Sequence, residues 1–157
     1  MDIIETERCR ITSFKEEMLD DFMLYRNDPV LMKYQFFKGL KREEYAAVLL
    51  GKNNIEKGMQ LAVTLKSNNN LIGDLFLKAE NNNKTLWIGY TIIPSYQRMH
   101  YAFEAVSGIL KEAKNRGYQN IMAGILPENI NSSGLLNKLN FKYLKTEGGE
   151  RIYILEL

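Results

Sequence analysis

The residues best placed to do chemistry lie in one stretch, Trp87 to Ala102, which reads WIGYTIIPSYQRMHYA. It runs from an apolar strand through a proline-containing turn into the start of a long helix. The first N–H groups of a helix have no intrahelical partner and lie at the positive end of the helix dipole. Arg98 and His100 add side chains that can contact an anion. The sequence therefore predicts an anion-binding site at this strand-to-helix junction.

The composition is that of an ordinary globular protein. The chain has 157 residues, of which 45% are hydrophobic and 25% charged, and this suits one domain over residues 1–157. A net charge of +2 gives no signature of a nucleic-acid or membrane partner. Cys9 is the single cysteine, so we expect no disulfide within the chain and no metal site. Without a signal-like or membrane-spanning apolar run, the chain is predicted to be cytoplasmic.

Three elements are predicted before the central strands. Apolar and polar residues alternate from Ile3 to Phe14, as in an exposed strand. A helical apolar pattern comes next and ends before Pro29, because the residue before proline is pushed out of the α region. The helical pattern recurs from Lys41 to Asn53. The chain is thus expected to begin with a strand and two helices.

Strand patterns dominate the middle of the chain. Residues 59–65, 71–78 and 85–93 are separated by asparagine-rich tips, which predicts an antiparallel meander. Apolar residues then recur at helical spacing over residues 102–116, and Gly117 suits the end of that helix.

The last part of the chain predicts a strand, a helix and a hairpin. The strand covers residues 120–126, Ser132 or Ser133 is expected to cap the helix, and the hairpin pairs residues 141–147 with 152–157. The strands on either side of the long helix must then be parallel neighbours. The predicted fold is α/β (α+β), a single mostly antiparallel sheet of about seven strands with a central parallel pair and helices on both faces.

Four stretches, in this order, resemble the GNAT superfamily of N-acetyltransferases and specifically its ribosomal-protein, RimJ/RimL-like branch. ETERCRITSF is similar to the first strand of that branch, and YRNDPVLMKY to the end of its first helix and the segment after it. The family pattern IGY, followed by a short strand end and then P-x-Y-Q-x-x-G-Y-A-x-E-A, is similar to IGYTIIPSYQRMHYAFEA in this chain. The family pattern P-x-N-x-x-S-x-x-L-L-x-K-L-G-F is similar to PENINSSGLLNKLNF. The resemblance covers nearly the whole chain and implies transfer of an acetyl group from acetyl-CoA to a primary amine.

The same resemblance implies roles for individual residues. The backbone at Ile92 and Ile93 would pair with the pantetheine arm of the cofactor and face the developing oxyanion. Asn129 matches an asparagine that binds this arm. Ser132 matches a serine near the sulfur and is the candidate catalytic residue, assisting the departing thiolate. Main-chain N–H groups of the loop would bind the pyrophosphate, and these belong to Gln97, Arg98, Met99, His100, Tyr101 and Ala102.

The loop departs from the family pattern at two positions. His100 stands where relatives have glycine, and Arg98 replaces a second glycine that is frequent in this branch. A positive φ at His100 would carry a penalty of about 1–3 kcal/mol. Such a penalty would weaken cofactor binding roughly tenfold to a hundredfold unless phosphate contacts offset it. His100 is therefore a compensating phosphate ligand, an indicator of lost activity or a surface residue with no role.

No general base is evident from the sequence. The stretch before IGY, KTLW, has no carboxylate where many relatives carry glutamate, and Asn137 stands where many others have a tyrosine acid. The remaining candidates are water relayed to bulk or a carboxylate from elsewhere, such as Asp74, Glu80 or Glu104. Glu104 equally suits a first-turn acid that complements the helix dipole.

Aromatic residues could form the acceptor site. Tyr34, Phe36 and Phe37 fall where the family seats the acceptor, whereas Trp87 and Tyr90 are more typical of core or rim positions. The resemblance implies a small-molecule amine or a protein N-terminus as acceptor, with a monomer or homodimer as the assembly. The alternative is a catalytically silent acyl-CoA-binding or protein-interaction module on the same fold. A nucleotide-binding regulatory domain is a third interpretation, and the chain lacks its glycine-rich fingerprint.

Overall fold

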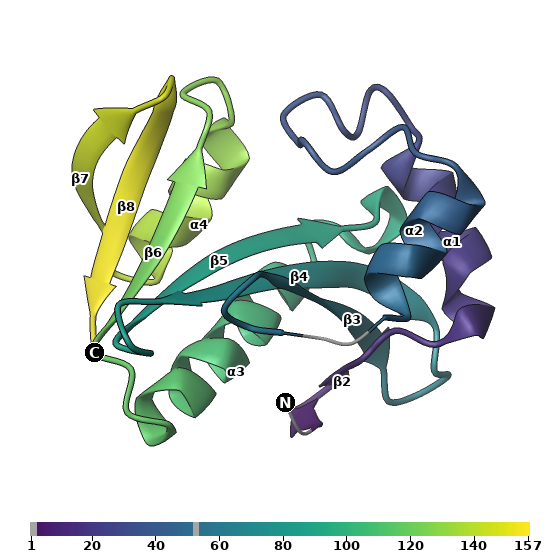
Figure 1. Cartoon of the computed structure of the whole chain (residues 1–157), viewed down its shortest axis with the longest axis horizontal. Helices are drawn as coiled ribbons and strands as arrows, with labels where there is room; N and C mark the ends of the chain where they lie inside the picture. Colours follow the sequence, from purple (N-terminus) through teal and green to yellow (C-terminus); the bar gives the residue numbers. More distant parts are fainter. Residues whose placement is uncertain (1–2, 52–53) are drawn as a thin grey trace.

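One mixed sheet organises the computed structural model, which describes residues 3–51 and 54–157. Its eight strands follow the order β1-β2-β3-β4-β5-β6-β8-β7, and β5 and β6 form the one parallel pair in the described part of the chain (Figure 1). The strands are β1 Ile4–Glu5, β2 Cys9–Thr12, β3 Met59–Leu65, β4 Leu71–Glu80, β5 Thr85–Ile92, β6 Asn120–Ile125, β7 Lys142–Glu147 and β8 Glu150–Glu156. The helices are η1 Glu16–Met18, α1 Leu19–Arg26, α2 Arg42–Leu49, η2 Pro94–Tyr96, α3 Tyr101–Asn115 and α4 Ile130–Lys138. This architecture confirms the predicted fold class. None of the helices found in residues 3–51 and 54–157 is long and apolar enough to span a membrane.

The eighth strand arises because the strand predicted over residues 3–14 is a tight hairpin. Thr6 closes the turn: its N–H donates to the Cys9 carbonyl, and its hydroxyl accepts from the Cys9 N–H, both at 3.0 Å. Ile4 then lies opposite Ile11. Apolar and polar residues alternate with a period of two both in a single strand and in a hairpin of this kind. The alternation from Ile3 to Phe14 therefore could not distinguish the two. The second helix ends at Leu49, and residues 52–53 of its predicted range lie outside the described residues.

The long helix α3 covers one face of the sheet, which we call the α3 face. Ala105, Val106 and Ile109 of this helix pack in one buried cluster with Leu86 of β5 and Ile121 of β6. All five side chains are almost fully buried. Side chains alternate between the two faces of a sheet. Because Leu86 of β5 points to the α3 face, the β5 residues directly before and after it point to the opposite face.

The helices α1 and α2 cover part of the opposite face, which we call the α1/α2 face. Phe22, Tyr25 and Tyr45 pack over Ala62 and Leu71 in a second buried cluster. Phe22 makes edge-on ring contacts with both tyrosines, at centroid distances of 5.3 and 5.2 Å. The second cluster fixes α1 and the segment after it against β3 and β4.

The parallel strands β5 and β6 separate after a short region of pairing. They pair only from Thr85 to Trp87 of β5, and beyond that point the described part of β6 pairs with β8 alone. The two strands diverge along their length (Figure 1). β5 continues to Ile92 with β4 as its neighbour on the other edge. The sheet therefore opens between β5 and β6, and we call this feature the β5/β6 opening.

Candidate active site

The edge of β5 that faces the opening carries main-chain hydrogen-bonding groups. The N–H of Ile93 donates to the Ile72 carbonyl of β4 at 2.8 Å. The N–H and C=O groups of successive residues in a strand point alternately to its two edges. The main-chain groups of Tyr90 and Ile92 therefore point away from β4 and toward the opening. The side-chain amide of Gln97 donates to the Ile92 carbonyl at 2.9 Å. The structure thus corrects the role expected of the Ile93 N–H, which pairs within the sheet, and leaves the N–H of Ile92 at the opening.

The loop after β5 leads to the free end of α3. The first hydrogen bond of the helix runs from the Glu104 N–H to the His100 carbonyl at 3.0 Å. The N–H groups of Tyr101, Ala102 and Phe103 consequently have no partner within the helix. The side chain of Gln97 bonds back to the strand, so it shapes the loop instead of extending toward an anion. A helix N-terminus with free N–H groups therefore lies where the sequence predicted it, and anion binding there stays a prediction.

Two residues of the loop adopt the left-handed conformation. Arg98 has φ of 63°, and His100 has φ of 65° with ψ of 18°. Both positions are those where the family pattern has glycine, and both side chains are exposed. Histidine is enriched in this region relative to most residues. The positive φ is already present in the folded loop, so its energetic penalty lowers the stability of the fold. The tenfold to hundredfold loss of cofactor affinity expected from the sequence therefore does not follow from φ alone.

Arg8, which the sequence did not single out, holds this loop from the N-terminal hairpin. Its guanidinium donates to the Met99 carbonyl at 3.0 Å and lies 4.1 Å from the centre of the Tyr101 ring. It also pairs with the Glu104 carboxylate at 2.7 Å. Because 96 residues separate Arg8 and Glu104, no local spacing could have indicated the contact.

Glu104 is therefore a structural residue and not a free base. Its carboxylate accepts hydrogen bonds from the Thr6 hydroxyl, the Arg8 N–H and the Arg8 guanidinium. Burial raises the pKa of Glu104, but these three donors outweigh that effect and hold the pKa below its ordinary value. This ionised carboxylate, held by three hydrogen bonds, orients the start of α3.

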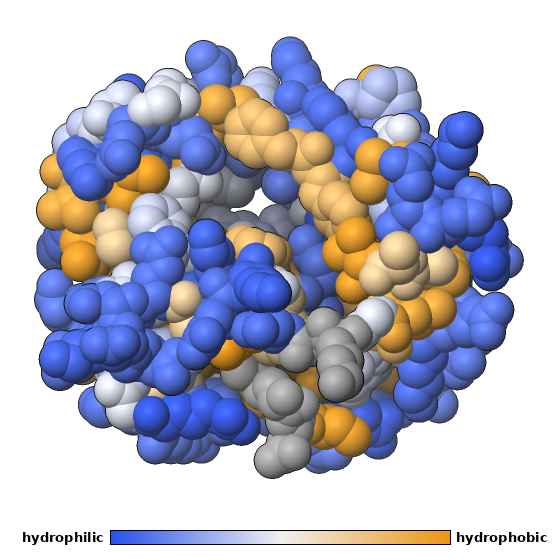
Figure 2. Space-filling model, in the orientation of Figure 1, coloured by the Kyte–Doolittle hydropathy of each residue, from blue (hydrophilic) through white to orange (hydrophobic). Residues whose placement is uncertain are grey.

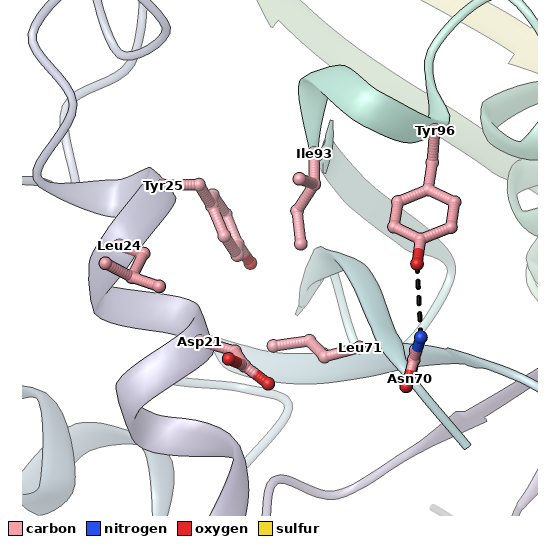
Figure 3. Close-up of a pocket in the computed structure, with 7 residues that line it drawn as sticks. All are labelled: Asp21, Leu24, Tyr25, Asn70, Leu71, Ile93 and Tyr96. Carbon is pink, nitrogen blue, oxygen red and sulfur yellow. Dashed lines mark hydrogen bonds between the residues drawn. The ribbon is translucent and has the colours of Figure 1, made fainter. Parts of the chain in front are cut away.

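A pocket on the α1/α2 side of the loop is shown in Figure 3. Its volume is about 360 Å³, and its lining comes from α1, the start of β4 and the loop: Asp21, Leu24, Tyr25, Asn70, Leu71, Ile93 and Tyr96. The Asn70 amide donates to the Tyr96 hydroxyl at 3.3 Å (Figure 3). The Tyr96 ring also lies edge-on to Tyr101, with 6.3 Å between centroids. Tyr96 thus joins Asn70 to the loop and, like Arg8, contacts the Tyr101 ring.

The first turn of α4 forms the other wall of the opening. Asn129 is the N-cap of this helix, and its side-chain oxygen accepts from the Ser132 N–H at 3.3 Å. The prediction that Ser132 or Ser133 caps the helix was wrong, because the helix begins three residues earlier. The capping bond uses the oxygen of Asn129 and leaves its amide N–H₂ group to donate elsewhere. Ser132 is half-buried in the first turn, whereas Asn137 is exposed.

Tyr90 joins the two walls of the opening. Its hydroxyl donates to the Ser132 carbonyl at 3.2 Å. Burial raises the pKa of Tyr90 to about 12, and the hydrogen bond to Ser132 opposes this only in part. Tyr90 thus links β5, two residues before Ile92, to the first turn of α4, which carries Asn129 and Ser132.

The other two carboxylates that the sequence offered as bases also have structural partners. Asp74 is 1% exposed, pairs with Arg26 at 2.7 Å and accepts from the Tyr25 hydroxyl. Glu80 accepts from the Trp87 indole at 2.9 Å, near the beginning of β5 and away from the loop. Neither carboxylate is placed to take a proton at the opening.

Glu150, which no pattern in the sequence indicated, lies on the α1/α2 face of β6. Gly124 alternates with the buried residues of β6 and therefore faces away from α3. A Cβ atom added to Gly124 would come within 3.3 Å of a Glu150 carboxylate oxygen. Figure 2 shows a hollow between the segment after α1 and the β6, β8 and α4 half of the molecule. Glu150 is therefore a carboxylate on the same face as this hollow.

The aromatic cluster predicted near the acceptor is divided in the structure. Phe37 packs into the core against Phe22 and Tyr45, at centroid distances of 6.0 and 5.3 Å. Phe36 is 75% exposed. Tyr34 contacts the Lys33 ammonium instead. These residues belong to the segment after α1 that borders the hollow, but they do not form one cluster.

A mixed sheet that opens between its parallel strands beside a free helix N-terminus is the fold of GNAT-type acetyltransferases. The family model described as an acetyltransferase (GNAT) domain matches residues 8–142, and the chain belongs to this family. The similar "Uncharacterized N-acetyltransferase YnaD" of Bacillus subtilis (strain 168) is 30% identical over 140 residues, covering 88% of this chain and 82% of that protein.

Two solved structures share the fold at lower identity. The acetyltransferase (GNAT family) from Bacillus anthracis has a TM-score of 0.82 and 23% identity, with 99% of this chain and 98% of that chain covered. A RimL ribosomal L7/L12 alpha-N-protein acetyltransferase in complex with coenzyme A has a TM-score of 0.82 and 15% identity, with the same coverage. These likenesses show the shared fold, and the ribosomal-protein branch stays a prediction.

Proposed function

We propose that the chain is an acetyl-CoA-dependent N-acetyltransferase that catalyses direct attack of a primary amine on the thioester in a ternary complex. The observation that carries this proposal is the β5/β6 opening, where the main-chain groups of Tyr90 and Ile92 lead toward the free N-terminus of α3. An extended amide-containing arm can pair with such an edge as an added strand. A pyrophosphate at its end would meet the helix N-terminus.

The residues of the opening fit the cofactor in its three parts. The N–H groups of Arg98, Met99, His100, Tyr101 and Ala102 would hold the pyrophosphate, with the loop braced at Met99 by Arg8. The Asn129 amide would donate to the pantetheine arm while its oxygen caps α4. The bound cofactor supplies the activated acetyl thioester. A cytoplasmic location and a monomeric or homodimeric state are part of the proposal.

The reacting carbonyl would lie between β5 and the first turn of α4. The N–H of Ile92 would donate to its oxygen as negative charge develops there. The hydroxyl of Ser132, half-buried in that turn, would assist the departing thiolate. We expect Ser132→Ala to lower kcat more than the affinity for acetyl-CoA, as measured by steady-state kinetics and calorimetry. Unchanged kinetics would remove this assignment.

The amine would approach over the α1/α2 face. Glu150 beside Gly124 supplies a carboxylate there, which suits attraction of an ammonium and, directly or through water, removal of its proton. An ammonium ion has no lone pair, so a proton must leave before attack. The acceptor is a small-molecule amine or a protein N-terminus; the latter is what the name of the RimL structure states for that protein.

The test combines calorimetric titration with a thiol-release assay. We expect acetyl-CoA to bind and to be turned over with at least one class of amine in a panel of polyamines, amino acids, aminoglycosides and N-terminal peptides. The absence of both heat and thermal shift at millimolar acetyl-CoA would refute the proposal. Glu150→Gln should lower turnover at a given pH without weakening acetyl-CoA binding, and Glu147→Gln on the same hairpin is the matched control.

Two observations favour a second function, a catalytically silent acyl-CoA-binding module. His100 and Arg98 occupy left-handed positions where the family resemblance implies glycine, and Asp74, Glu80 and Glu104 have structural partners. Binding of acetyl-CoA without turnover across the whole amine panel would support this module over the enzyme.

A further inference from the structure

The side chain of Tyr90 occupies a position between the two walls of the β5/β6 opening. Its main-chain groups lie on the free edge of β5, and its ring packs against the core of the α3 face. Its hydroxyl reaches the Ser132 carbonyl in the first turn of α4. Among the described residues, Tyr90 is the phenol that bonds to this turn. Any thioester placed between the edge of β5 and Ser132 would therefore lie beside this hydroxyl.

The bond between Tyr90 and Ser132 is weak and dispensable for α4. Its length of 3.2 Å exceeds the usual O–H···O range of about 2.5–3.0 Å. A carbonyl in the first turn of a helix also accepts the N–H four residues ahead, so it does not depend on the phenol. The hydroxyl can thus rotate toward a stronger acceptor without leaving a buried group unpaired. A thiolate is such an acceptor because it carries a full charge.

We propose that the Tyr90 hydroxyl turns from the Ser132 carbonyl to the sulfur of the coenzyme A thioester and stabilises the thiolate as it departs. This inference rests on the proposed function. The neutral amine nitrogen bonds to the carbonyl carbon and loses a proton to Glu150, directly or through water. The C–S bond breaks, and its electron pair passes to sulfur, which accepts the hydrogen bond. The phenol keeps its proton, because its pKa of about 12 lies well above that of an ordinary thiol, about 8.5. Asn137, where the resemblance implies a tyrosine acid, is exposed on α4, so the Tyr90 phenol would assist the thiolate together with the Ser132 hydroxyl.

The test measures the pKa of the thiol of bound coenzyme A, a property independent of the acceptor amine. The thiolate is followed by its ultraviolet absorbance during a pH titration of the complex, and the same titration with desulfo-coenzyme A is subtracted. A hydrogen bond from Tyr90 lowers the thiol pKa, so Tyr90→Phe should raise it by about one unit, a tenfold change in thiolate fraction. Tyr143→Phe, whose hydroxyl bonds only to nearby Thr146 among the described residues, is the matched control and should leave the value unchanged.

Each outcome distinguishes the inference from the function on which it rests. Equal thiol pKa values in wild type and Tyr90→Phe, with tight binding in both, overturn the inference alone. Failure of wild type to bind coenzyme A overturns the proposed function and the inference with it. Site-specific fluorotyrosine at position 90 keeps the ring and hydroxyl but donates more strongly, so it should lower the thiol pKa below the wild-type value. A fluorotyrosine variant with the wild-type value would contradict the inference even if Tyr90→Phe did not fold.

Discussion

Replacing His100 by glycine or by alanine separates the energy of the loop from its chemistry. His100 has φ of 65° and ψ of 18°, and its side chain makes no capping hydrogen bond to α3. Glycine removes both the Cβ atom and the imidazole, whereas alanine removes the imidazole and keeps the Cβ. The two variants therefore differ only in the left-handed penalty and in the space that the Cβ occupies.

The expected magnitudes come from the backbone geometry. A left-handed residue with a Cβ atom costs about 1–2 kcal/mol, and the greater freedom of glycine in the unfolded chain offsets about 0.5–1 kcal/mol. His100→Gly should thus be about 1 kcal/mol more stable than His100→Ala, which corresponds to about 2–4 °C in Tm for a domain of this size. Because the penalty belongs to the folded loop, the two variants should bind coenzyme A within roughly threefold of each other. An imidazole contact to phosphate at this exposed position would make wild type roughly three- to tenfold tighter than both.

Thermal unfolding and calorimetric titration measure the two effects independently. Phosphopantetheine lacks the pyrophosphate, so it should bind wild type and both variants equally and serves as the ligand control. Equal Tm values for the glycine and alanine variants would contradict the assignment of strain to φ. A tenfold tighter binding of coenzyme A by His100→Gly than by His100→Ala would show that crowding at the phosphate, and not folding, carries the penalty.

Three further predictions concern the supports of the site. Asn129→Ser keeps an oxygen to cap α4 and should preserve stability, whereas Asn129→Ala should lose about 0.5–2 kcal/mol of unfolding free energy. Calorimetry should show weaker coenzyme A binding in both variants. Full affinity in the serine variant would contradict a role for the amide. Asp74→Asn leaves Arg26 buried at 3% exposure without its charge partner, so urea unfolding should report a loss of about 3–5 kcal/mol; a loss below about 1 kcal/mol would disprove the importance of this pair. The lowered pKa of Glu104 stabilises the fold above the ordinary glutamate pKa and loses this contribution as the pH falls. The stability difference between wild type and Glu104→Gln should accordingly be constant at neutral pH and shrink from about pH 5 to about pH 3; a difference that grows on acidification would refute the sign.

After the N-terminal hairpin, local patterns were enough to predict the order of the main elements and the loop after β5. The meander, α3 and the C-terminal hairpin depend on periodicity and turn residues that act within a few positions. The resemblance also located Asn129 and Ser132, which the fold brings to one wall of the opening. It could not give the direction of main-chain groups at Ile92 and Ile93, because direction depends on the register with β4.

The carboxylates show most clearly where sequence reasoning stopped. Asp74, Glu80 and Glu104 were indistinguishable as candidate bases until their partners were known. Each is bonded to a residue that no motif had joined to it, as with Arg26 and Asp74, 48 residues apart. Conversely, Glu150 had no signal at all, because its proximity to Gly124 arises from the pairing of β6 with β8.

The sequence by itself indicated the family and most of the elements, and it predicted an anion-binding junction, since these depend on residue types at short, fixed spacings. Only the tertiary structure decided that β5 and β6 separate after Trp87, that Arg8 braces Met99 and that Tyr90 reaches Ser132. Those features are contacts between segments that the order of strands in the sheet brings together. A contact of this kind depends on the path of the whole chain, which local periodicity does not specify.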